Sequence, residues 1–283
     1  MNILDDNIPK IIFIVPYRNR APHLLHFKVY MKYILSDFPE TDYKIYFVHQ
    51  KDSLPFNRGA MKNIGFLAMK NKYPNHYKNI TFVFNDIDNM PCEKNLLKYE
   101  TSKGTIKHFF GFNWTLGGIV SINGEDFEKL NGYPCYWAWG QEDNDLHTRA
   151  LHSKIKIDRS QFYKFGDTRI INIKNDANRT LSKEQVFRAG FKNTEGITDI
   201  KNLHYSFDRD MINVTHFITR VNPLKDNYYE FDPTKEARPI VDPKYMPKDA
   251  VNSLNELTKW GLPRHDKIAS QLNRSRGIGM RLF

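Results

Sequence analysis

Apolar and polar positions follow two different periods in the first part of the chain. Short runs rich in β-branched and aromatic residues predict buried strands at residues 11–15, 43–48 and 80–84. Between these runs, apolar residues recur with helical spacing, first after Pro22 and again between Arg58 and Lys70. Because predicted strands and helices alternate, we expect an α/β fold with a mainly parallel sheet flanked by helices.

The two predicted helices each present one apolar face. The first face comprises Leu24, Phe27, Tyr30, Met31, Ile34 and Phe38, and the second comprises Met61, Ile64, Leu67 and Ala68. A further helix is expected to start at Glu142 and to run to Ala150.

Charged residues follow each predicted strand. Arg18 and Arg20 follow the first, Arg58 comes after the second, and Asp86 and Asp88 follow the third. Ligands of such sheets bind beyond the carboxyl ends of the strands. Guanidinium groups suit phosphate, and two nearby carboxylates suit a hard divalent cation. The pattern predicts a nucleotide-diphosphate site, whereas the alternative is a turn with solvated acids.

Glycine and tryptophan pairs mark the next region. Gly117 and Gly118 would allow a ligand to approach the backbone closely, although a plain tight turn is the alternative. Trp137 and Trp139 precede a run of acids, and aromatic faces stack on sugar rings or nucleobases. The other interpretation is a core tryptophan followed by a helix N-terminus, where acids complement the helix dipole.

Composition narrows these possibilities. The 283 residues include 40% hydrophobic residues, enough for one large domain or two small ones with a packed core. The net charge of +10 favours an anionic partner, which could be nucleic acid, a membrane surface or a phosphorylated substrate. The chain contains no recognised nucleic-acid-binding motif, so we expect no specific nucleic-acid partner.

Two cysteines, Cys92 and Cys135, are too few for a zinc cluster or a disulfide scaffold. We expect both to be reduced thiols, with one disulfide as the alternative. No apolar run approaches the roughly 20 residues that span a bilayer, and the N-terminus has no basic signal region. We therefore expect a soluble, cytoplasmic protein without signal peptide or anchor, encoded by a microbe or a large virus, or else a chain lacking its anchor.

Five motifs in this chain, across residues 9–222, resemble in order and spacing those of the β-1,4-galactosyltransferase family, glycosyltransferase family 7. They are Pro16-Tyr17-Arg18-Asn19-Arg20, Phe56-Asn57-Arg58, Asp86-Ile87-Asp88, Leu116-Gly117-Gly118 and Trp137-Ala138-Trp139-Gly140-Gln141-Glu142-Asp143. The family forms are Pro-Phe-Arg-Asn-Arg, Phe-Asn-Arg, Asp-Val-Asp, Phe-Gly-Gly and Trp-Gly-Trp-Gly-x-Glu-Asp-Asp. Five ordered motifs are far more specific than any single one.

The resemblance implies a GT-A fold, Rossmann-like, and an inverting transfer of galactose or N-acetylgalactosamine from a UDP-sugar to a hydroxyl of a glycan or glycoconjugate. The alternatives are another donor, UDP-glucose or UDP-xylose, and a non-catalytic relative that binds glycans or nucleotides.

The resemblance also implies roles for particular residues. Nucleotide-sugar contacts are implied for Pro16, Tyr17, Arg18, Arg20, Phe56, Arg58, Asp86, Ile87, Asp88, Gly118 and Trp139. Asp143 is implied as the general base with Glu142 as a second catalytic carboxylate, and acceptor contacts are implied for Trp139, Glu142, Asp143 and Asn144. A Mn²⁺ or Mg²⁺ ion would bind at Asp88 and Asp86.

Three departures from the family pattern affect these expectations. Asn144 replaces an aspartate and can hydrogen-bond an acceptor but cannot act as a base. Thr115 stands where galactose-specific members tend to carry a bulky aromatic residue, which leaves room for an N-acetyl group. The family's metal-binding histidine has no counterpart in residues 168–176. Oxygen ligands there, Asn175 or Asp176, would favour harder ions, and His204 or His216 are other candidate ligands.

The resemblance ends near residue 222, so we expect a catalytic domain at residues 1–222 and a Pro-rich, basic extension at 223–283. The extension holds six of the 14 prolines and is expected to pack on the domain or to form a partly extended tail. Residues 251–260 predict one short helix. The basic residues of 264–283 predict a solvated tail, with a segment that binds a partner or a membrane surface as the alternative.

Overall fold

The computed structural model describes residues 8–173, 179–182 and 194–231. The predicted helix at 251–260, the basic segment at 264–283, and Asn175 and Asp176 lie outside these residues.

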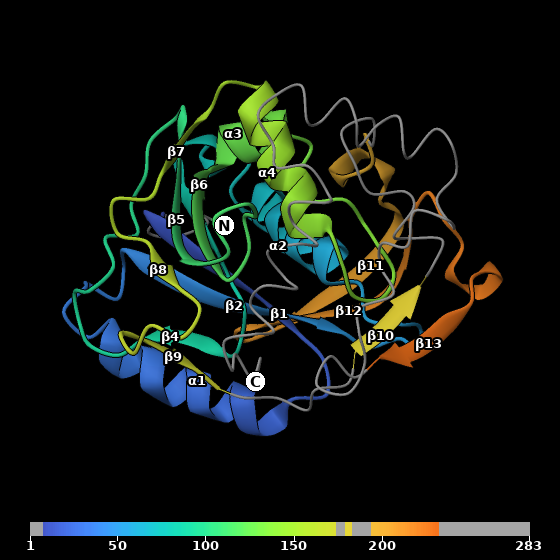
Figure 1. The fold of residues 1–283 in the computed structure, drawn as a ribbon, viewed down its shortest axis with the longest axis horizontal. Helices are drawn as coiled ribbons and strands as arrows, with labels where there is room; N and C mark the ends of the chain where they lie inside the picture. The colour runs from blue at the N-terminus through green and yellow to red at the C-terminus, as the bar shows by residue number, and fades with distance from the viewer. Residues whose placement is uncertain (1–7, 174–178, 183–193, 232–283) are drawn as a thin grey trace, which may run out of the picture.

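A nine-stranded mixed sheet forms the centre of the molecule (Figure 1). Its strands run in the order β11-β12-β2-β1-β3-β6-β5-β7, and β8 also pairs with β5. They are β1 (Ile11–Tyr17), β2 (Tyr43–Gln50), β3 (Thr81–Asn85), β5 (Thr105–Gly111), β6 (Ile119–Asn123), β7 (Lys156–Asp158), β8 (Tyr163–Lys164), β11 (Lys201–Asp208) and β12 (Met211–Ile218). The predicted strands β1, β2 and β3 are mutually parallel, with β1 in the middle, as expected for an α/β fold.

Helices cover both faces of this sheet (Figure 1). Helix α1 (Ala21–Ile34) lies on one face, and α2 (Arg58–Lys72), α3 (Gly124–Lys129) and α4 (Glu142–His152) lie on the other. Alternate residues of β1 therefore enter different cores: Phe13 packs with α1, and Ile14 packs with α2. Burial of both faces explains why β1 is a continuous apolar run.

Helix boundaries follow the sequence signals closely. Pro22 occupies the first turn of α1, where a missing amide costs nothing. The expected apolar face extended to Phe38, but α1 ends at Ile34, and Phe38 packs onto the core from the following turn. The predicted start of a helix at Glu142 is confirmed.

Two short sheets complete the described fold. Strand β4 (Asn89–Pro91) pairs with β9 (Ile170–Asn172), and β10 (Arg179–Ser182) pairs with β13 (Tyr228–Phe231), both antiparallel. Single 3₁₀ turns occur at Tyr77–Asn79, Ile197–Asp199 and Pro223–Lys225. Strand β13 belongs to the expected extension and pairs with the strand that lies beside the motif Trp137–Gly140.

Two further predictions from the sequence concerned the state of the two cysteines and the absence of a membrane-spanning helix. Cys92 and Cys135 do not form a disulfide with each other, so that alternative is wrong. Among the residues with assigned structure, none of the helices combines the length and apolar character needed to cross a bilayer.

Candidate active site

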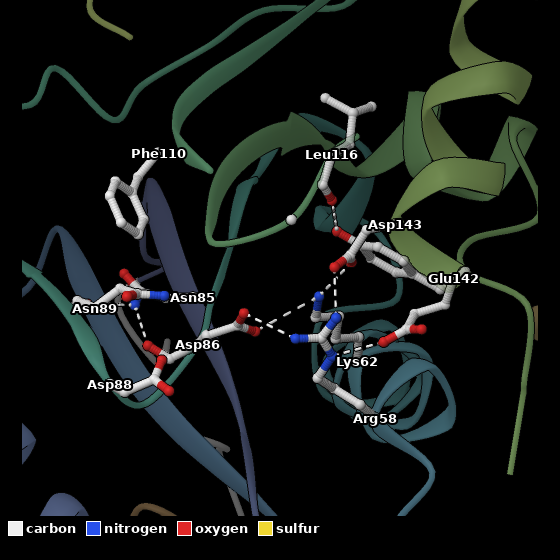
Figure 2. A network of polar contacts seen from close by, with 12 residues as sticks. Arg58, Lys62, Asn85, Asp86, Asp88, Asn89, Phe110, Leu116, Glu142 and Asp143 are labelled. Carbon is white, nitrogen blue, oxygen red and sulfur yellow. Dashed lines mark hydrogen bonds and ion pairs between the residues drawn. The ribbon is translucent and has the colours of Figure 1, made fainter. Parts of the chain in front are cut away.

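The carboxyl ends of β1, β2 and β3 bring charged residues to one edge of the sheet, where α2 and α4 begin. Figure 2 shows the resulting network, in which Arg58 and Lys62 of α2 face Asp86 beyond β3 and the carboxylates at the start of α4. The sequence predicted four of these five groups and missed Lys62.

Arg58 is the centre of the network. Its guanidinium donates to Glu142 Oε1 at 2.6 Å, Asp86 Oδ2 at 3.0 Å and Asp143 Oδ2 at 2.5 Å. Burial acts to lower the pKa of Arg58, but the carboxylates of Asp143, Asp86 and Glu142 together raise it well above its ordinary value. Arg58 is held in place because Asn57 caps α2, accepting from the Ala60 amide at 2.8 Å.

Lys62 lies one helical turn after Arg58, on the same face of α2. Its side chain is only 1% exposed, and its Nζ lies 3.0 Å from Asp143 Oδ1 and 3.7 Å from Asp86 Oδ1. The ammonium also sits 4.3 Å from the centre of the Tyr133 ring. The signal that could have revealed Lys62 is its i, i+4 spacing from Arg58, which places both cations on one helical face.

The glycine pair brings the backbone of the loop against these carboxylates. A Cβ on Gly117 would overlap the Asp143 carboxylate, and the Leu116 amide donates to the Asp143 carbonyl at 2.9 Å. Gly118 has a φ of +72° and accepts from the Asp86 amide at 2.9 Å. The pair therefore serves close approach, which only glycine permits, and joins the two sides of the site.

His108 supports this loop from behind. Its Nε2 lies 3.0 Å and 3.1 Å from the carbonyl oxygens of Phe110 and Gly117, while Arg159 Nε donates to its Nδ1 at 3.2 Å. This arrangement requires a neutral ring with the proton on Nε2. Burial first, and then the nearby Arg159 charge, lower the pKa of His108 to about 3.

The turn after β3 carries the predicted metal residues. Asn85 Nδ2 donates to the carbonyls of Asp86 and Asn89, both at 2.8 Å, and thereby shapes the turn. Asp88 forms an ion pair with Arg20 at 3.3 Å, and its carbonyl accepts from the Ile173 amide at 2.8 Å.

The donor set around this turn consists of oxygen atoms. Within the described parts of the chain, no three His, Cys, Asp or Glu side chains are arranged to hold a metal ion. His204 and His216 face each other across β11 and β12, with ring centroids 5.5 Å apart, and do not join such a group. Two carboxylates still fit a Mg²⁺-type ion that takes its other ligands from water and substrate phosphates.

The other predicted nucleotide residues lie at different depths. Pro16, Tyr17 and Ile87 are buried, whereas Phe56 is half-buried. Arg18 donates to the carbonyls of Leu54 and Asp52, the latter at 2.9 Å, and therefore fixes the loop between β2 and α2.

The two tryptophans have different environments. Trp137 is buried, stacks on Phe217 with ring centroids 5.0 Å apart, and donates to Thr219 Oγ1 at 2.8 Å. Trp139 is half-exposed, and its amide donates to the Thr180 carbonyl at 2.8 Å. The core interpretation thus holds for Trp137, whereas Trp139 is only partly buried.

Arg179, beside Thr180 on β10, is a cation that the sequence analysis missed. Its pKa is lowered by burial and by the charge of Arg20, while Asp88 acts to raise it. Arg179 thus lies within electrostatic range of the Arg20–Asp88 pair, although β10 is far from both in the sequence.

Family models match the chain on both sides of this site. The N-terminal region of glycosyl transferase group 7 matches residues 6–100, and the N-terminal domain of galactosyltransferase matches residues 106–174. Together these models cover more than half of the chain.

Individual relatives agree with the family models. Human β-1,4-galactosyltransferase 4 is 32% identical over 165 residues, which are 54% of this chain and 45% of the relative. Mouse β-1,4-galactosyltransferase 1 is 33% identical over 159 residues, or 53% of this chain and 39% of the relative. The chain thus spans less than half the length of these curated relatives.

Solved structures share the fold. A mutant of Drosophila β-1,4-galactosyltransferase 7 in complex with manganese, UDP-Gal and xylobiose has a TM-score of 0.60 at 21% identity, covering 77% of this chain and 97% of that one. The catalytic domain of the same enzyme with xylobiose has a TM-score of 0.58 at 20% identity, covering 82% of this chain and 100% of that one. The chain belongs to glycosyltransferase family 7 and has the GT-A fold.

Proposed function

We propose that this chain is an inverting glycosyltransferase that moves galactose or N-acetylgalactosamine from a UDP-sugar to a glycan hydroxyl, with Asp143 as general base. The observation that carries the proposal is the position of Asp143, whose carboxylate faces the carboxyl edge of the sheet beside Asp86 and Glu142. Membership of family 7 supports the same reaction class.

Asp143 would start the reaction by removing a proton. As the acceptor hydroxyl oxygen forms a bond to the anomeric carbon, its proton moves to the Asp143 carboxylate. The bond from the anomeric carbon to UDP breaks on the opposite face, and its electron pair stays on the diphosphate. An α-linked donor would therefore give a β-linked product.

Carboxylates around Arg58 suit a sugar because they accept hydrogen bonds from hydroxyls. Glu142 Oε2 and Asp86 Oδ1 are buried and accept no hydrogen bond from the described residues. A buried acceptor without a donor is costly, so a polar ligand at these atoms stabilises the site. Sugar hydroxyls supply such donors.

The basic residues at the rim suit the diphosphate. Arg20 forms an ion pair with Asp88, and Arg179 interacts electrostatically with both residues. Their guanidinium groups would offset the charge that grows on the leaving group. Arg58 would exchange some of its carboxylate contacts for phosphate contacts when the donor binds, because its side chain is 25% exposed.

Asp88 is the better candidate for the metal carboxylate. Asp86 contacts Arg58 and Lys62, the two cations that also hold Asp143, whereas Asp88 pairs at 3.3 Å with Arg20, whose side chain is more exposed than those of Arg58 and Lys62. A Mn²⁺ or Mg²⁺ ion bound there would offset charge on the diphosphate. Because these ligands are oxygen atoms, we expect Mg²⁺ to support activity nearly as well as Mn²⁺.

A donor panel tests the proposal. UDP release is measured from UDP-Gal, UDP-GalNAc, UDP-glucose and UDP-xylose with Mn²⁺, Mg²⁺ or chelator, using simple β-linked saccharides as acceptors. We expect acceptor-dependent release from UDP-Gal or UDP-GalNAc that chelator reduces. Strict rejection of UDP-GalNAc would remove the role suggested for Thr115, and absence of release from all four donors would contradict the enzyme assignment.

A further inference from the structure

We propose that Lys62 is the positioning residue of the general base: it holds one oxygen of Asp143 so that the other oxygen receives the acceptor proton. The inference rests on the proposed function and assigns a role to a residue outside the five sequence motifs.

The two oxygens of Asp143 have different cationic partners. Arg58 Nη2 contacts Oδ2 at 2.5 Å, and Lys62 Nζ contacts Oδ1 at 3.0 Å. The side chain of Arg58 is 25% exposed, whereas that of Lys62 is 1% exposed. Oδ2 is therefore paired with the more exposed cation and Oδ1 with the buried one, and we assign the proton-accepting role to Oδ2.

The surroundings of Lys62 fix its ammonium in this place. A buried lysine is costly unless its charge is paired. Here Asp143 and Asp86 supply opposite charge, and the ring of Tyr133 supplies a cation–π contact at 4.3 Å. Tyr133 is itself held, because its hydroxyl donates to the Leu116 carbonyl at 3.2 Å.

Lys62 would keep this contact throughout the reaction. When Arg58 turns toward the diphosphate, Oδ2 loses its guanidinium partner and becomes the acceptor of the hydroxyl proton. Lys62 keeps its three protons and transfers none of them. Its role is to hold the carboxylate plane, since a misplacement of about 1 Å can cost about a hundredfold in rate.

The test replaces the ammonium by an apolar group of similar shape. In Lys62→Met, we expect kcat to fall about tenfold to a hundredfold while the KM for the donor changes less than about threefold. We also expect the acid limb of the kcat profile to move to higher pH. One positive charge beside Asp143 is lost, while Arg58, Asp86, Glu142 and the Tyr133 hydroxyl remain around it.

The matched control is Lys70→Met on the same helix. Lys70 pairs with Glu128 at the surface, so this variant should leave kcat and its pH profile unchanged. Lys62→Gln is a second variant, which removes the charge but keeps a hydrogen-bond donor. Thermal unfolding and UDP affinity are measured for every variant before kinetics.

The outcomes separate this inference from the proposed function. If the wild type turns over a UDP-sugar and both Lys62 variants match it in kcat and pH profile, the inference is wrong and the function stands. If both Lys62 variants fail to fold, Lys62 has a structural role and the inference is also wrong. Absence of turnover by the wild type would instead contradict the proposed function.

Discussion

At the scale of single residues, the site is a network of charges that satisfy one another. Arg58 and Lys62 face the carboxylates of Asp86, Glu142 and Asp143, so the buried cluster holds one more acid than base. Networks of this kind restrict side-chain geometry, because the cost of an unpaired charge in a low-dielectric site is high. One negative charge of the cluster is therefore unbalanced, and a bound cation or a hydrogen-bond donor of a ligand would offset it.

Ala138 departs from the family motif in a way that affects stability. The motif has glycine between its tryptophans, whereas this chain has alanine with a φ of +76°. A left-handed conformation costs a non-glycine residue roughly 1–2 kcal/mol, and glycine recovers this cost minus about 0.4–1 kcal/mol of unfolded-state entropy. We therefore expect Ala138→Gly to raise the free energy of unfolding by up to about 1.5 kcal/mol.

Thermal and denaturant unfolding measure this change. The control is Ala150→Gly within α4, which should lower stability by at least about 0.5–1 kcal/mol, since glycine is unfavourable in a helix interior and the Ala150 methyl is buried in the core. A destabilised Ala138→Gly variant would show that the alanine methyl contributes packing that outweighs the backbone strain.

At the scale of elements, helix starts and strand ends place the chemistry. Helix α2 begins at Arg58 because Asn57 caps it, and α4 begins at Glu142 with three acids in its first turn. Carboxylates near a helix N-terminus interact favourably with the helix dipole, so the start of α4 adds to the ion pairs that Glu142 and Asp143 form with α2.

Two buried histidines, His108 behind the glycine pair and His147 on α4, should make the protein less stable in acid. Burial and Arg159 lower the pKa of His108 to about 3 and that of His147 to about 4, from an ordinary value of 6.5. Above pH 6.5 both residues are neutral in both states, and stability is constant on their account. As the pH falls from 6.5 toward 4 and 3, the unfolded chain takes up protons that the folded chain resists, so stability falls.

Unfolding midpoints between pH 8 and pH 4 check this prediction. The His108→Gln variant should show a shallower loss with acid than the wild type, because one of the two resistant histidines is gone. An unchanged slope for His108→Gln would mean that His108 titrates normally in the folded protein.

The sequence predicted these elements unevenly, for identifiable physical reasons. The periodicity of α2 was readable from Met61 and Ile64, but Lys62 between them reads as a solvated position. In the structure ten of the 15 residues of this helix are buried, since the loop around Tyr133 and Pro134 covers its other side. Only the tertiary arrangement shows that Lys62 points into a carboxylate cluster.

At the scale of the whole molecule, strand pairing between segments far apart in the chain produced features that the sequence pattern did not predict. Strands β11 and β12 carry many polar and exposed residues and were not predicted, yet β12 extends the sheet in parallel with β2. Likewise β10 reaches the site through the Trp139 backbone and brings Arg179 near Asp88. Such contacts depend on chain topology rather than on local pattern, so neither was visible in the periodicity.

The structure also shows how charged residues are balanced at the site of a chain whose net charge is +10. The arginines at the strand ends suggested an excess of positive charge at the site. In the described residues, Arg20, Arg58, Lys62 and Arg179 are matched by Asp86, Asp88, Glu142 and Asp143. The site is therefore close to neutral as a whole, which suits a donor bound together with a cation.

The general base is the central claim, and Asp143→Asn tests it most directly. UDP release from the preferred donor is compared with and without acceptor in the wild type, in Asp143→Asn and in the control variant Asp126→Asn. Asp126 lies on α3, and its buried carboxylate accepts a hydrogen bond from the Gly104 amide. We predict that Asp143→Asn retains UDP affinity but loses acceptor-dependent release by about a hundredfold to ten-thousandfold, while Asp126→Asn keeps it. Wild-type release by a folded Asp143→Asn variant would contradict the account.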